Sequence, residues 1–291
     1  MPSPWLLAIR PKTLPAAAAP VVLGTAIAAH AGVLRWPPAL AALAGALLIQ
    51  IATNLANDYF DFVKGADTEE RVGPTRVTQA GLLSPEAVRR AMLLTLGAAT
   101  VVGAYLVAVG GVPILVVGLA ALLCAVAYTG GPYPLAYHGL GDLFVFVFFG
   151  LVAVAGTVYV QALEWLPQAV WAGAGVGAVS TALLVVNNLR DIDTDRRAGK
   201  RTLATRLGVA GTRVEYTLLW AVAMGVPVVG IGLFGWPSTV LLSLLGVVVA
   251  GRAMRLVWTG GTPEQVAEAL PPTAAGLMAY AAGFAVGLVL G

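Results

Sequence analysis

The sequence predicts an all-α protein that crosses a membrane many times. Hydrophobic residues make up 59% of its 291 residues and charged residues only 11%, whereas an ordinary soluble domain is about 25% charged. The apolar residues also form blocks of about 20, the length that a helix needs to cross the roughly 30 Å hydrocarbon layer. We place nine spans in one domain, 1–291, at residues 15–31, 37–57, 87–109, 112–129, 141–163, 167–188, 213–235, 236–257 and 270–290.

The connections between these spans differ on the two sides of the membrane. Those near residues 110, 164 and 236 are short and marked by Pro or Gly, as in helical hairpins. The connections on the other side of the membrane are long and charged, and sixteen of the seventeen basic residues fall at that face, with only Arg35 on the opposite side. The sixteen are Arg10, Lys12, Lys64, Arg71, Arg76, Arg89, Arg90, Arg190, Arg196, Arg197, Lys200, Arg201, Arg206, Arg213, Arg252 and Arg255. Because Lys and Arg are retained on the cytoplasmic side, we expect the N-terminus inside and the C-terminus outside.

This charge pattern excludes several function classes. The basic bias accounts for the isoelectric point near 9.2, and the chain has no basic tract interleaved with aromatic residues of the kind that binds single-stranded nucleic acid. We therefore expect no nucleic acid partner. The single cysteine, Cys124, excludes internal disulfides and cysteine-based metal sites.

Two acidic clusters continue apolar spans into the long connections. In the first connection, about 54–86, Asn54, Asp58 and Asp61 are spaced i, i+4, i+7, which places them on one helical face. Asn57 is also four residues before Asp61. This spacing predicts a polar face at the end of the second span.

The second connection, about 187–212, contains a similar acidic cluster. Asn188, Asp191 and Asp195 are spaced i, i+3, i+7 and share a face, while Asp193 points elsewhere and is expected to be solvated or to cap a helix. Both clusters lie at the same membrane face in the nine-span arrangement. The sequence thus presents two similar acidic helix ends to one compartment.

Carboxylates one turn apart repel each other, and near hydrocarbon each costs up to about 2.5 to 3.5 kcal/mol. Mg²⁺ would offset that cost, since it is typically held by one or two carboxylates together with substrate phosphates. Asp and Asn are also common at helix ends and turns, so one such cluster could be merely solvated. Two matching clusters favour two magnesium ions with a diphosphate between them.

The clusters resemble the paired motifs of the UbiA superfamily of intramembrane prenyltransferases. The motif residues are Asn57-Asp58-x-x-Asp61 and Asp191-x-x-x-Asp195. Flanking stretches are similar to those of the 1,4-dihydroxy-2-naphthoate prenyltransferases: 10–15, 57–61, 73–76, 139–142 and 199–208. Many superfamily members carry a further acid where this chain has Gly65, and Asp67 is a candidate replacement.

The resemblance implies nine helices around a central cavity that opens to the cytoplasm, in a cell membrane. It also implies the reaction: a polyprenyl diphosphate ionises, and its allylic carbon joins 1,4-dihydroxy-2-naphthoate with loss of CO2. The product would be a demethylmenaquinol, an intermediate of menaquinone biosynthesis. The expected partners are those two substrates, Mg²⁺ and membrane lipid.

The clusters and their basic neighbours supply the candidate site residues. The expected magnesium ligands are Asp58, Asp61, Asp191 and Asp195. The candidates to assist as ligands or to orient the carboxylates are Asn54, Asn57 and Asn188. The candidates for the phosphate oxygens are Lys64, Lys200, Arg201, Arg10 and Lys12. For the basic residues, contact with lipid headgroups or water is the alternative reading.

Three further residues are candidates for the organic part of the substrates. Tyr128 is expected to stabilise the allylic carbocation through its ring face. Asp142, at the start of the fifth span, either caps that helix or positions the naphthol hydroxyls. Arg76 is the candidate for the aromatic carboxylate, and an apolar groove is needed for the prenyl tail.

Two other functions remain open at this point. A secondary transporter also uses intramembrane carboxylates, although its sites usually lie near the membrane midplane instead of at helix ends. Another member of the same superfamily could use 4-hydroxybenzoate, homogentisate or a porphyrin-type acceptor. The position of both acidic clusters at one membrane face favours the enzyme.

Overall fold

The computed structural model describes residues 3–65, 73 and 75–291, and within them the chain is helical with no strand. Asp67 and Arg71, both named in the sequence predictions, lie outside the described residues. The first half contains α1 (Pro4–Ile9), η1 (Pro11–Thr13), α2 (Leu14–His30), α3 (Trp36–Val63), α4 (Pro85–Ala127), η2 (Leu135–His138), α5 (Gly141–Phe146), the π-helical η3 (Val147–Val152) and α6 (Ala153–Ala162). The second half contains α7 (Pro167–Arg190), α8 (Ile192–Arg197), α9 (Leu203–Phe234), η4 (Ser238–Leu244), α10 (Leu245–Val249), α11 (Gly251–Thr259), α12 (Pro263–Ala267) and α13 (Leu270–Leu290).

Eight helices among the described residues are long and apolar enough to cross a membrane. One of them, α4, has 43 residues, and at 1.5 Å per residue it would extend for about 64 Å, twice the hydrocarbon thickness. Its backbone is not helical at Gly111, where φ is 68° and ψ is −153°. The parts before and after Gly111 correspond to the predicted spans 87–109 and 112–129. A multi-pass membrane protein is confirmed, while the count of nine crossings and their orientation stay predictions.

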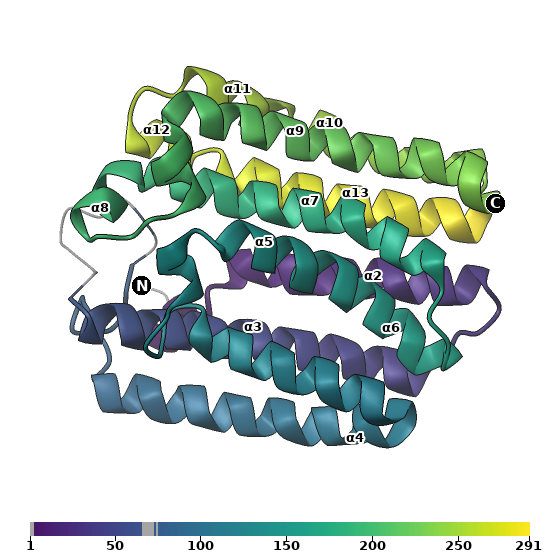
Figure 1. Cartoon of the computed structure of the whole chain (residues 1–291), viewed down its shortest axis with the longest axis horizontal. Coiled ribbons are helices and arrows are strands. Elements are labelled where there is room, and N and C mark those ends of the chain that lie inside the picture. The colour runs from purple at the N-terminus through teal and green to yellow at the C-terminus, as the bar shows by residue number, and fades with distance from the viewer. Residues whose placement is uncertain (1–2, 66–72, 74) are drawn as a thin grey trace.

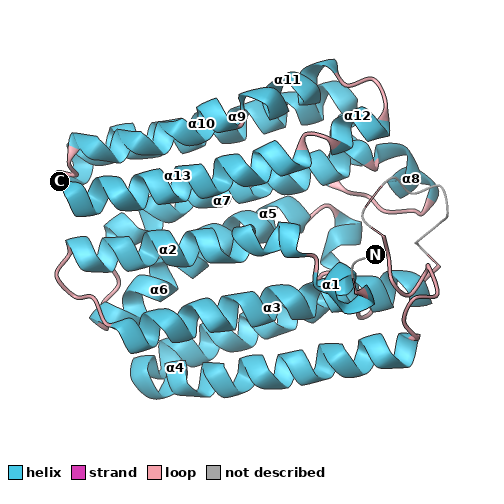
Figure 2. Cartoon of the chain, turned by 180° about the vertical axis from the view of Figure 1, so that it is seen from behind, coloured by secondary structure: helices cyan, strands magenta, loops and turns pink. Residues whose placement is uncertain are grey.

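The long helices run side by side, and the short helices α1, α8 and α12 lie at one end of the bundle (Figures 1 and 2). We call this the motif end, because α3 and α7 finish there, next to α1 and α8. The C-terminus lies at the opposite end in both views (Figures 1 and 2). The two acidic clusters, which are 133 residues apart from Asp58 to Asp191 in the chain, are therefore brought to the same end of the molecule.

The most buried long helix is α7, which packs against α9, α5, η3 and α13. Its Ala and Val side chains form the centre of the main hydrophobic core, together with large side chains such as Trp220, Tyr280 and Phe284. The outer faces of α4 and α9, by contrast, expose many Leu and Val side chains. Exposed apolar surface of this extent fits contact with lipid tails.

Glycines allow α7 to approach the α5–α6 span closely. A Cβ added at Gly177 would lie 2.6 Å from the carbonyl oxygen of Phe146, and one at Gly150 would lie 2.5 Å from that of Gly173. Small residues are common at such contacts between membrane helices. Gly173 and Gly177 make this contact within one chain.

We expect Gly177→Val to reduce stability by about 1–3 kcal/mol, the usual effect of overpacking a tight core. The measurement is thermal unfolding of the purified protein in detergent. Gly97→Val is the matched control, because a Cβ at Gly97 meets nothing within 4 Å, and it should leave the unfolding temperature near that of the wild type. Equal effects of the two substitutions would contradict close packing at Gly177.

Candidate functional site

The first acidic cluster lies on the last turns of α3, as its spacing predicts, and is almost completely removed from solvent. Asp58 is 0% exposed and Asp61 is 2% exposed. Burying a carboxylate without a partner costs several kcal/mol. The groups that contact each of these two carboxylates therefore indicate its role. These partners differ between the two residues.

Asp58 holds the connection that follows α3. Its two oxygens accept hydrogen bonds from the backbone N–H groups of Val77 (3.1 Å) and Thr78 (3.0 Å), and Arg10 Nη2 lies 3.7 Å from Oδ2. Arg10 has a left-handed backbone conformation with φ of 53°, which is uncommon for a residue with a side chain. The carboxylate predicted to bind metal is thus occupied by hydrogen bonds to a loop.

Asn54 has a similar task toward the N-terminal segment. Its amide nitrogen donates to the carbonyl oxygen of Ile9 (2.8 Å) and to Thr13 Oγ1 (2.9 Å), while its own oxygen accepts from Gln50 Nε2 (3.2 Å). These contacts fix the turn that carries Arg10. The role of Asn54 beside a metal ion stays a prediction.

Asp61, one turn further, meets side chains from three other segments. Arg76 Nη2 donates to Oδ2 at 2.9 Å, and the Tyr137 hydroxyl donates to Oδ1 at 3.0 Å. Lys200 Nζ lies 3.5 Å from the same Oδ1. Lys200 follows the second acidic cluster in sequence, so the segment after α8 reaches Asp61.

The second cluster surrounds the junction of α7 and α8. Asp191 ends α7 with φ −96° and ψ 8°, so the single helical face predicted for Asn188, Asp191 and Asp195 is interrupted there. The Arg190 guanidinium binds both Asp191 oxygens, at 2.7 and 2.6 Å. Asp193, predicted to be solvated, has a side chain that is 86% exposed.

The segment between α4 and α5, residues 128–140, connects the two clusters. Thr129 Oγ1 donates to Asn57 Oδ1 (2.8 Å), and Lys64 Nζ donates to the carbonyl oxygen of Thr129 (2.6 Å). On the other side, the Arg201 N–H donates to the carbonyl oxygen of Tyr137 (2.9 Å). The segment is therefore held from both sides, next to Asp61.

The electrostatics follow from this crowding. The negative charges of Asp142, Asp195 and Asp61 all act on the Tyr128 hydroxyl. Desolvation lowers the pKa of Lys64; the Asp61 carboxylate opposes this effect and the Lys200 ammonium adds to it. Charges from both clusters therefore act on the same side chains.

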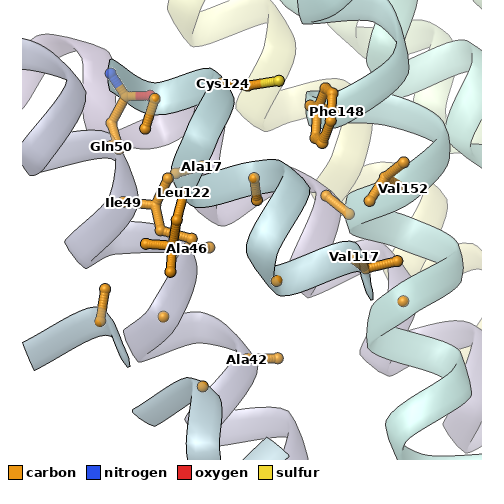
Figure 3. A pocket seen from close by; sticks show the side chains of 18 of the residues that line it. Ala17, Ala42, Ala46, Ile49, Gln50, Val117, Leu122, Cys124, Phe148 and Val152 are labelled. Carbon is orange, nitrogen blue, oxygen red and sulfur yellow. The ribbon is translucent and has the colours of Figure 1, made fainter. Parts of the chain in front are cut away.

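A cavity of about 600 Å³ begins beside this network and extends among α2, α3, α4, η3 and α6. Asn54, Asn57 and Tyr128 belong to its lining, and most of the remaining surface is apolar. Figure 3 shows part of that apolar lining, including Ala46, Leu122, Phe148 and Val152. Such a cavity can hold a hydrocarbon chain whose polar end reaches the acidic residues.

Some predicted residues take other positions. Lys12 is exposed on η1, and the Arg201 side chain is exposed as well; in the described part of the chain no ion pair joins either to the acidic clusters. Asn188 is half-buried on the last turn of α7. Asp142 is 6% exposed, and neither of its oxygens has a hydrogen-bond partner among the described residues, so it does not cap α5.

Sequence reasoning missed Tyr137, Thr129 and Arg190. Arg190 was counted only as part of the basic bias, although it is buried against Asp191. Tyr137 and Thr129 lie in a connection on the motif side whose start, residues 128–133, has no Lys or Arg. Because it lacks the basic charge that determines topology, this stretch was the available sign that the connection has a different role.

Comparison with known proteins decides the family. A model of the UbiA prenyltransferase family matches residues 17–269. This chain belongs to the UbiA prenyltransferase family. It is 41% identical to a 1,4-dihydroxy-2-naphthoate octaprenyltransferase of Mycobacterium tuberculosis, over 99% of this chain and 97% of that protein. It is 42% identical to one of Escherichia coli, over 74% of this chain and 72% of that protein.

Solved UbiA structures share the fold. A UbiA homolog from Aeropyrum pernix superposes with a TM-score of 0.70 at 19% identity, covering 96% of this chain and 97% of that one. One from Archaeoglobus fulgidus, bound to DMAPP and Mg²⁺, gives 0.67 at 13% identity, covering 98% and 100%. Membership of the UbiA family makes this chain a prenyltransferase, and the transporter alternative is not retained.

The contacts of Asp58 predict a structural effect of its removal from this UbiA enzyme. Asp58→Ala leaves two buried N–H groups without acceptors, at about 1–3 kcal/mol each, so the unfolding temperature should fall even without magnesium and substrate. Asp193→Ala, at an exposed site, should not change it. A purely metal-binding Asp58 would show the reverse: unchanged stability of the metal-free protein and a raised magnesium requirement.

Proposed function

We propose that this enzyme transfers a polyprenyl group from its diphosphate to 1,4-dihydroxy-2-naphthoate, with loss of CO2, in a magnesium-dependent reaction of menaquinone biosynthesis. The observation that carries the proposal is the contact between the first acidic helix end and the segment that follows the second, where Lys200 Nζ lies 3.5 Å from Asp61 Oδ1. The names of the relatives from Mycobacterium tuberculosis and Escherichia coli support the choice of acceptor.

The residues at the junction fit Mg²⁺. No group of three acidic, His or Cys side chains within the described ranges could hold a metal by itself, which suits an ion that takes one or two carboxylates and completes its shell with water and substrate phosphates. The proposed ligands are Asp61, Asp191 and Asp195, with Asn57 and Asn188 beside them. We assign Asp58 to anchoring the loop in place of metal binding. Two ions is the proposed number.

When bound, Mg²⁺ would supply charge neutralisation for the departing diphosphate. The protein adds two ammonium groups from opposite sides, Lys64 on the end of α3 and Lys200 after α8. Both are held in place by neighbouring groups, since Lys64 donates to Thr129 and Lys200 contacts Asp61. Preorganised cations of this kind stabilise developing negative charge without further rearrangement.

The cavity is assigned to the prenyl tail. Its lining is largely apolar, and each CH2 group removed from water contributes about 0.8 kcal/mol, although lipid competes for the same tail. Tyr128 stands at the polar end of the cavity, where its ring can face an allylic cation. We propose that the allylic carbon reacts at this point.

Asp142 is assigned to the acceptor. It lies next to Tyr128 in space, since a Cβ on its neighbour Gly141 would be 3.0 Å from the Tyr128 hydroxyl. Its buried carboxyl has no hydrogen-bond partner in the described part of the chain, and such a group is costly unless it meets a donor. A naphthol hydroxyl would supply one. Arg76, the earlier candidate for the acceptor carboxylate, is instead bound to Asp61.

We further propose that the enzyme lies in the cell membrane with the motif end in the cytoplasm. Fifteen of the sixteen basic residues assigned to the cytoplasmic side are in the described part of the chain, and the long connections that carry them support this orientation under the positive-inside rule. Arg35 precedes α3, at the other end of that helix. The charged diphosphate head would then meet the site from the cytoplasmic side of the membrane.

The acceptor is tested by incubating purified protein with Mg²⁺, a polyprenyl diphosphate and 1,4-dihydroxy-2-naphthoate. We expect CO2 release in step with a prenylated quinol, detected by mass spectrometry. Asp195→Asn should lower the rate by about 100-fold, whereas Asp193→Asn, on the same short helix, should have little effect. Turnover of 4-hydroxybenzoate or homogentisate in place of the naphthoate would overturn the acceptor, and full activity of Asp195→Asn would remove its metal assignment.

The tail assignment predicts a change in chain-length preference. A Cβ at Gly118 meets nothing within 4 Å, and the residue lines the cavity, so Gly118→Leu should fill part of it. Displacing about two CH2 groups weakens binding by roughly 1.6 kcal/mol, or more than tenfold, for a long diphosphate but not for geranyl diphosphate. The ratio of kcat/KM for the two substrates measures this effect.

Gly97→Leu is the matched control for that ratio, because Gly97 is on the same helix but outside the cavity lining. It should leave the chain-length preference unchanged. A Gly118→Leu enzyme that uses long and short diphosphates in the wild-type ratio would show that the tail lies elsewhere.

A further inference from the structure

Tyr137, on the short helix η2, contacts both the end of α3 and the segment that follows α8. Its hydroxyl donates to Asp61 Oδ1 at 3.0 Å, and its ring lies against two ammonium groups, Lys64 Nζ at 5.0 Å and Lys200 Nζ at 4.8 Å from the ring centroid. We propose that Tyr137 is the positioning residue that holds one metal-binding carboxylate and two phosphate-binding cations in a single arrangement. This inference rests on the proposed function.

The hydroxyl acts on Asp61. A carboxylate that ligates a metal is oriented by the hydrogen bonds it accepts, and loss of such a partner typically weakens metal binding 10- to 100-fold. Arg76 holds one oxygen of Asp61, and Tyr137 holds the other. Because Tyr137 is a neutral donor, it fixes the rotamer of Asp61 without adding a further positive charge that would compete with Mg²⁺.

The ring acts on the lysines. Ammonium groups are attracted to the face of an aromatic ring within about 6 Å of its centroid, and both Lys64 and Lys200 meet this distance. They come from different helix ends, and their like charges repel each other. A shared ring therefore keeps two cations close together, as a diphosphate with several negative oxygens requires.

The backbone of Tyr137 is held as firmly as its side chain. Its carbonyl oxygen accepts from the N–H of Arg201 at 2.9 Å, and its N–H donates to the carbonyl oxygen of Pro134 at 3.0 Å. The neighbouring His138 carbonyl oxygen accepts from Arg206 Nη2 at 2.8 Å. Tyr137 is therefore bonded through its backbone to the segment after α8 and through its side chain to Asp61 on α3. It thus fixes the distance between these two parts of the site.

Two substitutions separate the hydroxyl from the ring. Tyr137→Phe keeps the ring beside the lysines and removes only the donor to Asp61. We expect the magnesium concentration at half-saturation to rise about tenfold, while the affinity for a prenyl diphosphate at saturating magnesium stays within about twofold. Tyr137→Leu removes both contacts. The magnesium concentration at half-saturation should therefore rise, and the affinity for the prenyl diphosphate should fall.

The measurement is binding of geranylgeranyl thiodiphosphate, an unreactive analogue, to the full-length protein in detergent, by calorimetry over a series of Mg²⁺ concentrations. Tyr133→Leu is the matched control. Tyr133 lies in the same connection but is 57% exposed and stacks on His138, so its loss should change neither quantity. Thermal unfolding of each variant reports any general loss of structure.

A Tyr137→Phe protein with the wild-type magnesium midpoint would overturn the role of the hydroxyl. Equal defects in Tyr137→Phe and Tyr137→Leu would overturn the role of the ring. The assay contains no aromatic acceptor, so a wrong acceptor cannot imitate either result. Failure of the wild-type protein to bind the analogue in magnesium would instead overturn the proposed function, and this inference with it.

Discussion

Buried carboxylates at the end of an apolar helix need partners inside the protein, because desolvating an unpaired ion costs several kcal/mol. Asp61 meets this requirement with side chains from three separate connections, carried by Arg76, Tyr137 and Lys200. Each connection is thereby fixed relative to α3. The polar end of the bundle is organised around this one carboxylate, much as the apolar part is organised around α7.

A single helix end serves two purposes because of its periodicity. Asn54 and Asp58 are four residues apart and hold the N-terminal segment and the loop at 77–78. Asn57 and Asp61 are also four residues apart, on the adjacent strip of the same polar face, and both contact the 128–140 segment. One strip of this polar face therefore holds the neighbouring segments in place, and the adjacent strip contacts the 128–140 segment beside the proposed site.

Much of this arrangement could be predicted from the sequence, since hydrophobic block length fixes the helices and i, i+4 spacing fixes the faces of α3. The contacts that distinguish residues holding the loops from residues of the proposed site could not be predicted. Asp58 is distinguished from Asp61 by backbone N–H groups about 20 residues away, and no local pattern encodes that pairing. Tyr137 could not be predicted for the same reason, because its ring contacts Lys64 and Lys200 only after three connections have folded together.

A prenyl diphosphate has a strongly charged head and an apolar tail, so a site for it must join an ion-binding network to a cavity that excludes water. Asn57 belongs to both, since it lines the cavity and accepts a hydrogen bond from Thr129 in the network. Asp61 follows it by one turn, a rise of about 6 Å along the axis. A rigid helix thus sets the distance between the end of the tail cavity and the carboxylate beside the diphosphate. Because that spacing is built into α3, helix geometry would place the bond to be broken in the proposed site at the boundary between the two environments.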